Sequence, residues 1–217
     1  MNAPSPLRVG TTGDYRPLTW RDPDTGRFSG RDIGMVSAFA AAQGRKPAFI
    51  ATTWAAMLDD LAAGRFEMAV GGISRTPDRA EAALLSDTIE TTGKVAVVRR
   101  GEQERYRTME DIDREGVRVV ENRGGTNERF GLERIRHAEM IIVPDNHEPF
   151  DFLRGKKADV MFTDSVEADY LERQKSGLCA ANTSAPFTHV DKVFLFGKDQ
   201  RVLQQDFNRW LVTHHRA

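Results

Sequence analysis

The sequence predicts an α/β protein built as two lobes. Strand-like segments alternate with segments of helical periodicity, which is typical of largely parallel sheets covered by helices. The alternation breaks at residues 94–98 and 192–196, two strand-like segments that each follow an irregular one (residues 84–92 and 176–190). Two such crossings suit a chain that leaves one lobe, builds a second and returns. We therefore expect two mixed sheets flanked by helices and joined by two hinge strands.

These crossings give the expected boundaries of the lobes. Residues 1–94 and 191–217 would form lobe 1, and residues 95–190 would form lobe 2. A ligand would lie in a cleft between them, near the carboxyl ends of the strands, where open α/β sheets bind their ligands.

In lobe 1, each expected element follows from a local pattern. The helix over residues 32–43 has apolar residues at helical spacing and stops at Gly44. Another helix begins at Thr76-Pro77, because proline is well accepted in the first turn. The remaining expected elements are strands at 7–12, 47–51 and 67–73, and helices at 54–61 and 202–212.

Lobe 2 repeats the alternation. Gly124-Gly125 forms a turn that opens a helix ending near Ile135. The other elements expected here are strands at 117–120, 140–143 and 158–162, and helices at 148–153 and 165–174.

Composition excludes several classes of function. The 217 residues carry 31 Lys+Arg against 32 Asp+Glu, so the basic excess that nucleic-acid binding needs is missing. No apolar run approaches the length of a membrane span. The single cysteine, Cys179, rules out an intrachain disulfide, and the five histidines show no metal-ligand spacing, so we expect no metal site.

The amino terminus bears on localisation. Residues 1–6 have neither a basic nor an apolar region, so they do not form a secretory signal. Either the protein is cytoplasmic, or a signal was removed and a new methionine added.

Candidate ligand-binding residues of lobe 1 lie at strand ends and helix starts. Arg79, in a first helical turn beyond the strand that ends near Ser74, could bind a carboxylate through two hydrogen bonds. The alternative is a surface arginine paired with Asp78 or Glu81. The other candidates here are Asp14, Tyr15 and Trp54, the last of which is as easily a core residue.

The first crossing adds a cation, and lobe 2 adds a polar turn. Lys94 stands at this crossing, at the end of lobe 1, and together with Arg79 would favour an anionic ligand with two carboxylates. Thr126 and Asn127 follow the glycine turn, where backbone N–H groups attract anions. The alternatives are a solvated lysine and a helix start capped by Thr126 or Asn127.

Asp164 and Glu167 have the spacing of a capping box. The structural interpretation is that Asp164 caps the helix and Glu167 returns a bond to its backbone. The functional one is that both face the cleft, where desolvation would raise the pKa of a carboxyl group and make it a general acid.

Four segments together resemble a known family. They are Val9-Gly10-Thr11-Thr12-Gly13-Asp14-Tyr15-Arg16-Pro17, Gly30-Arg31-Asp32-Ile33, Thr53-Trp54 and Gly72-Ile73-Ser74-Arg75-Thr76-Pro77-Asp78-Arg79. In this order they resemble the periplasmic solute-binding proteins, which have a two-lobe type II fold. Within that family, the segments Asn122-Arg123-Gly124-Gly125-Thr126-Asn127-Glu128 and Thr163-Asp164-Ser165-Val166-Glu167-Ala168 are similar to the cyclohexadienyl dehydratase branch.

That resemblance implies a lyase that dehydrates and decarboxylates prephenate to phenylpyruvate, and arogenate to phenylalanine. Glu167 would be the general acid, with Lys94 and Asn127 as further catalytic residues. Substrate-binding residues would be Asp14, Tyr15, Trp54, Ser74, Arg79, Thr126 and Asp164.

The resemblance further implies a periplasmic protein that needs no metal or organic cofactor and whose partner is a small carboxylate substrate. A homo-oligomer is left open. The alternative function is a non-catalytic binding protein that delivers an amino acid or carboxylate to the permease of an ABC transporter.

Overall fold

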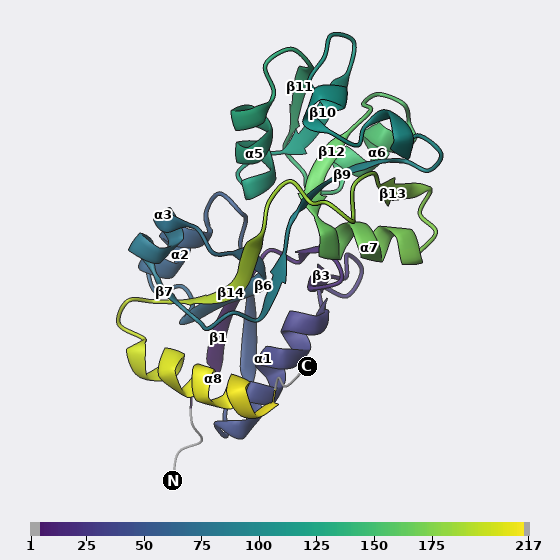
Figure 1. The fold of residues 1–217 in the computed structure, drawn as a ribbon. Coiled ribbons are helices and arrows are strands. Elements are labelled where there is room, and N and C mark those ends of the chain that lie inside the picture. Colours follow the sequence, from purple (N-terminus) through teal and green to yellow (C-terminus); the bar gives the residue numbers. More distant parts are fainter. Residues whose placement is uncertain (1–4, 215–217) are drawn as a thin grey trace. The chain divides into compact units, whose positions relative to one another are not determined.

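The computed structural model describes residues 5–214 (Figure 1). Residues 1–4, which make up most of the amino-terminal segment considered above, lie outside this range, and so does His215. The chain forms two compact units. Unit 1 contains the described residues up to Thr91 and those from Asp191 onward, and unit 2 is Thr92–Val190. Between residues 5 and 214, no helix combines the length and the apolar character that crossing a membrane would need.

Unit 1 is built on a six-stranded mixed sheet in the order β5-β1-β6-β14-β7, with β8 also paired to β14. Its strands are β1 (Leu7–Thr11), β5 (Pro47–Ala51), β6 (Met68–Ser74), β7 (Leu84–Leu85), β8 (Glu90–Thr92) and β14 (Val190–Phe196). β1 runs parallel to β5 and β6, whereas β14 runs antiparallel to β6 and β7. A second, antiparallel sheet consists of β2 (Asp14–Tyr15), β3 (Thr19–Arg21) and β4 (Phe28–Ser29). The helices are α1 (Arg31–Ala42), α2 (Met57–Ala62), α3 (Pro77–Ala82) and α8 (Arg201–His214).

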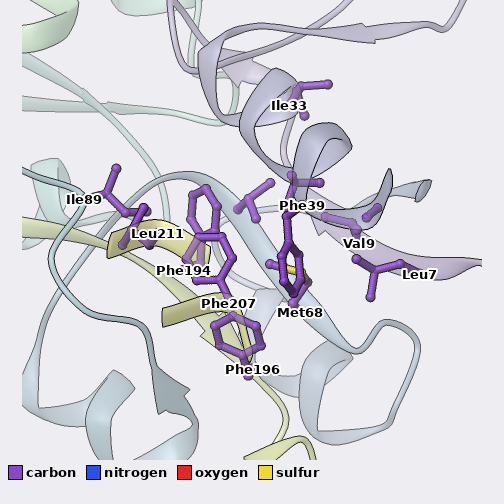
Figure 2. Close-up of a cluster of buried hydrophobic side chains, with 13 residues drawn as sticks. Leu7, Val9, Ile33, Phe39, Met68, Ile89, Phe194, Phe196, Phe207 and Leu211 are labelled. Atoms are coloured by element: carbon purple, nitrogen blue, oxygen red, sulfur yellow. The ribbon is translucent and has the colours of Figure 1, made fainter. Parts of the chain in front are cut away.

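Helices cover both faces of the large sheet, because side chains alternate along its strands. Figure 2 shows one face, where Phe39 of α1 and Phe207 of α8 lie against the aromatic rings of β14. The ring centroids of Phe39 and Phe207 are 5.2 Å apart, and those of Phe194 and Phe207 are 5.0 Å apart. On the other face, residues of β6 and β14 pack against α2. The rigid strands therefore hold the residues at their ends in fixed positions.

Unit 2 also has a mixed arrangement. β10 and β11 pair in parallel, while β9 lies antiparallel between β12 and β13. A parallel bridge from Val119 to Val160 links the two sets. The strands are β9 (Lys94–Arg99), β10 (Arg118–Asn122), β11 (Glu139–Val143), β12 (Met161–Asp164) and β13 (Leu178–Ala180). The helices are η1 (Gln103–Arg105), α4 (Met109–Ile112), α5 (Thr126–Arg134), α6 (Glu148–Arg154) and α7 (Ser165–Arg173).

The mixed sheets agree with the sequence prediction, with β9 and β14 running antiparallel to their neighbours. Two details of the prediction are wrong. The segments expected to be irregular contain the short strands β7, β8 and β13, which two or three residues of alternation cannot signal. Trp54 lies before α2 rather than in it, in a turn where the Thr53 hydroxyl accepts a hydrogen bond from the Ala56 N–H at 3.1 Å.

Candidate functional site

In unit 1, two cationic side chains converge on Ser74 at the end of β6. The guanidinium of Arg79 donates a 2.8 Å hydrogen bond from Nη1 to the backbone oxygen of Ser74. The ammonium of Lys192 donates a 2.9 Å hydrogen bond from Nζ to the Ser74 hydroxyl. All three residues are buried, and Arg79 is only 7 % exposed. The interpretation of Arg79 as a surface residue is therefore wrong.

Aromatic side chains lie beside these cations. The ring of Tyr15, on β2, has its centroid 5.6 Å from Nζ of Lys192 and 5.9 Å from the ring of Trp54, edge to face. Gly72 makes room for this ring, since a Cβ there would lie 2.5 Å from a Tyr15 ring carbon. Gly72 also has a φ of +76°, which few other residues adopt. A glycine at this point of β6 thus places Tyr15 against Lys192.

Two carboxylates of unit 1 complete this region. Asp14 precedes Tyr15 and is half-buried. Asp32, in the first turn of α1, accepts a 2.9 Å hydrogen bond from the N–H of Gly72. Burial raises the pKa of Asp32 to about 6, although the neighbouring Arg31 opposes the rise. Asp32 therefore supports the backbone of β6 directly beneath the Tyr15 ring.

In unit 2, Lys94 is at the centre of a polar cluster. Its Nζ lies 3.0 Å from Oδ1 of Asp164 and donates to Oγ1 of Thr126 at 3.1 Å. It also hydrogen-bonds to the Asn127 side-chain oxygen. Lys94 is only 4 % exposed, so the alternative of a solvated lysine is wrong. The β9–β12 register, which pairs Lys94 with Asp164, brings the ammonium and the carboxylate to the same face.

The two side chains with capping-box spacing do not form a capping box. Asp164 occupies the N-cap position of α7, but its side chain makes no capping hydrogen bond. Instead Asp164 pairs with Lys94, which offers a charged partner. Glu167 is 2 % exposed, and its Oε2 accepts a 2.6 Å hydrogen bond from the Thr163 hydroxyl. The capping interpretation of this pair is therefore wrong.

The capping interpretation is also wrong for the glycine turn before α5. Gly125 is the N-cap residue, and the helix start has no side-chain cap. Thr126 and Asn127 lie inside the first turn and hydrogen-bond to Lys94. The Glu128 carboxylate, one turn along, accepts a 2.6 Å hydrogen bond from the N–H of Gly124. The turn therefore positions two polar side chains around the lysine.

Sequence analysis missed a further buried acid in unit 2, besides Asp164 and Glu167. Glu121, on β10, is fully buried, and its Oε1 accepts a 2.6 Å hydrogen bond from the N–H of Phe162. Burial raises its pKa well above the usual range, opposed by that hydrogen bond and by Lys94, while Glu167 adds to the rise. The hydrogen bond places Glu121 against Phe162 of β12, next to Thr163, which donates to Glu167.

Two other kinds of site, metal centres and reactive thiols, can be compared with the structure. Within the described residues, no three or more His, Cys, Asp or Glu side chains are grouped as a metal site would require. Burial raises the pKa of the Cys179 thiol, which favours its unreactive protonated form.

Comparisons with known proteins show which family the chain belongs to. The family model of bacterial extracellular solute-binding proteins, family 3, matches residues 7–216. The chain belongs to this family, and its fold is the α/β type II fold of periplasmic binding proteins.

Several relatives show which members of the family the chain is similar to. The chain is 35% identical over 205 residues to cyclohexadienyl dehydratase of Pseudomonas aeruginosa, covering 94% of this chain and 76% of that protein. Among solved structures, an ancestral amino-acid-binding protein described as a precursor of cyclohexadienyl dehydratase matches with a TM-score of 0.86 and 30% identity. That match covers 95% of this chain and 88% of the other. An ancestral cyclohexadienyl dehydratase is 40% identical, with a TM-score of 0.55, over 95% of this chain and 86% of the other.

Proposed function

We propose that the protein is a cyclohexadienyl dehydratase that converts prephenate to phenylpyruvate, and arogenate to phenylalanine, by general acid catalysis. The observation that carries the proposal is the arrangement around Glu167. A protein that only binds an amino acid has no need of a second buried carboxyl group three residues after Asp164. The relationship to cyclohexadienyl dehydratases supports the same activity.

The cluster of unit 2 suits the proton transfer. Because Oε2 of Glu167 accepts a hydrogen bond from the Thr163 hydroxyl, the orientation of the carboxyl group is restricted. Fixed orientation matters, since a general acid acts only within hydrogen-bond reach of the atom that it protonates. Thr163 is a positioning residue in this account.

The reaction needs one proton for the departing hydroxyl and a binding site for the negatively charged carboxylates. The bond between the ring and its carboxylate breaks and releases CO2, and its electron pair enters the ring. The ring C–O bond breaks at the same time, and the hydroxyl leaves as water with the proton of Glu167. The product is aromatic, so the reaction is strongly downhill. General acid catalysis of this kind contributes about 10²–10⁴-fold.

The remaining candidates bind and orient the substrate in this proposal. Arg79 and Ser74 would hold one carboxylate, and Tyr15 and Trp54 would contact the ring. In unit 2, Lys94 would stabilise the departing carboxylate while Asn127 and Thr126 hold the ammonium in place. Asp14 would line the part of the ligand site that unit 1 provides, and Asp164 the part that unit 2 provides.

Incubation with prephenate tests the proposal directly. The absorbance of phenylpyruvate should rise in proportion to the amount of protein, and arogenate should yield phenylalanine. Heat-denatured protein provides the control for the slow spontaneous reaction. Prephenate that disappears no faster than in this control would refute the proposed activity.

A second candidate function is amino-acid binding without catalysis, for delivery to an ABC transporter permease. The likeness to an ancestral amino-acid-binding protein favours it. Calorimetry separates the two: tight binding of an amino acid without turnover of prephenate would support the transport function.

A further inference from the structure

Glu121 is a fully buried acid that the proposed mechanism does not use. It lies on β10 two positions after Val119, so the two side chains are on the same face of the sheet. On that face Val119 packs with Phe130 of α5 and Phe162 of β12. A Cβ at Gly131 of α5 would lie 3.5 Å from Cγ of Glu121, so the acid lies against the same helix. Glu121 thus occupies a position where the core would favour an apolar residue.

The Glu121 side chain contacts β12 at the point where backbone pairing between β10 and β12 ends. At the bridge, the N–H of Val120 donates to the oxygen of Val160 at 2.9 Å, and the N–H of Val160 donates to the oxygen of Arg118. A regular parallel ladder would next join the N–H of Phe162 to the backbone oxygen of Val120. The bridge is isolated, however, and the N–H of Phe162 donates to Oε1 of Glu121 at 2.6 Å. The side chain of Glu121 therefore serves as the acceptor where the ladder stops.

This contact lies one residue away from the group that orients Glu167. Phe162 is followed by Thr163, which is fully buried and whose hydroxyl donates to Oε2 of Glu167 at 2.6 Å. One edge of β12 pairs with β9, and the other edge faces β10, so Glu121 holds β12 from the side opposite β9. A shift of the peptide between Phe162 and Thr163 would move the hydroxyl that orients Glu167.

The surroundings of Glu121 suit a neutral carboxyl group. Among the residues that the structure describes, none hydrogen-bonds to its buried Oε2, whereas an ionised carboxylate needs donors at both oxygens. Burial raises the pKa of Glu121 well above its usual range. The hydrogen bond from β12 and Lys94 of β9 oppose this rise, while Glu167 of α7 and Glu128 of α5 add to it. Lys94 is itself in an ion pair with Asp164, at the end of β12.

We propose that Glu121 is a positioning residue for Glu167: as a neutral acid it holds the backbone of β12 at Phe162, so that Thr163 keeps the general acid oriented. A neutral side chain provides this contact without leaving a desolvated charge in the core. The inference deepens the proposed function and rests on it for the role of Glu167. The backbone contact and the neutral state are properties of unit 2 alone.

Two substitutions separate the backbone contact from the charge. Glu121→Gln keeps an oxygen that can accept from Phe162 and cannot ionise, so it mimics the neutral acid. Glu121→Leu is of similar size and removes the acceptor. Glu139→Gln and Glu139→Leu are the matched controls, because Glu139 is an exposed glutamate on the paired strand β11.

Three measurements are made on each protein. NMR gives the exchange rate of the Phe162 amide proton. It also gives the chemical shift of the Glu121 carboxyl carbon, which is assigned by comparison with Glu121→Gln and reports whether the acid is protonated. Assays with prephenate give kcat and KM.

At about pH 6, where an exposed glutamate is ionised, the Glu121 carbon of the wild type should have the shift of a protonated acid. Exchange at Phe162 should accelerate about tenfold or more in Glu121→Leu and stay slow in Glu121→Gln. In Glu121→Leu, kcat should fall about 10- to 100-fold with little change in KM, whereas Glu121→Gln should keep kcat within about threefold. Both Glu139 variants should match the wild type.

An ionised Glu121 at about pH 6, or exchange at Phe162 that is as slow in Glu121→Leu as in the wild type, would overturn the neutral backbone contact. Wild-type kcat in Glu121→Leu, or a loss of kcat in Glu121→Gln as large as in Glu121→Leu, would overturn the positioning role. If Glu121→Leu does not fold, slow exchange and retained kcat in Glu121→Gln support the proposal, and loss of either refutes it. If the wild type does not convert prephenate but both NMR results are as expected, the proposed activity falls and the neutral backbone contact stands.

Discussion

Loss of the Lys94 ammonium should destabilise unit 2 strongly. In Lys94→Met the carboxylate of Asp164, 3 % exposed as a side chain, would lose a cation 3.0 Å away. Removing one partner of a buried ion pair typically costs about 3–5 kcal/mol, because the other charge remains desolvated. Methionine keeps most of the volume, so a cavity adds little. We therefore expect the free energy of unfolding to fall by about 3–5 kcal/mol.

Urea unfolding followed by circular dichroism measures this change, and a double-mutant cycle isolates the pair. Asp164→Asn in the Lys94→Met background removes the orphaned charge, so the double variant should be more stable than Lys94→Met alone. Arg100→Met is the matched control. It breaks an ion pair with Glu172 in which both side chains are nearly half exposed, and it should cost less than about 1 kcal/mol.

The reasoning fails if Lys94→Met unfolds at the same urea concentration as Arg100→Met. It also fails if the two single changes at Lys94 and Asp164 are additive, because the buried ion pair would then contribute nothing of its own.

Three further predictions concern unit 1. Arg79→Ala should weaken binding of prephenate by about 2–3 kcal/mol, and an unchanged dissociation constant in calorimetry would contradict this. Gly72→Ala should lower the free energy of urea unfolding by about 2–5 kcal/mol, because its Cβ would collide with Tyr15; Gly116→Ala has the same backbone strain with open space around it, and should cost less. Folded Asp32 keeps its proton up to a pKa of about 6, against 3.8 when unfolded. The wild type should thus lose about 2–3 kcal/mol of stability between pH 4 and pH 7 relative to Asp32→Asn, and a constant difference in urea titrations would refute it.

Sequence reasoning found the long elements because their patterns are locally complete. The helix that contains Phe39 and the strand that ends near Ser74 each carry a repeated pattern over five or more residues. The strands β7 and β13 carry no such pattern, since partners elsewhere in the chain define them.

The residues of the candidate site also differ in whether a local pattern reveals them. Residues at strand ends and glycine turns, such as Arg79 and Asn127, are visible as polar groups where the pattern changes. Lys192 and Glu121 were missed because each lies within a strand. Only the register of β14 against β6 shows that Lys192 faces Ser74, and only the fold shows that Glu121 is buried. The capping interpretation of Asp164 failed because its partner, Lys94, lies 70 positions earlier in the sequence.

The most direct test of the proposed catalysis is the turnover of prephenate by Glu167→Gln. Glutamine keeps the size of the side chain and can still accept from Thr163, but it has no acidic proton to donate. Glu172→Gln, an exposed change on the same helix, is the control. We predict that kcat falls about 10²-fold or more while the dissociation constant of an unreactive carboxylate and the melting temperature change little. A Glu167→Gln protein that converts prephenate at the wild-type rate would contradict the account.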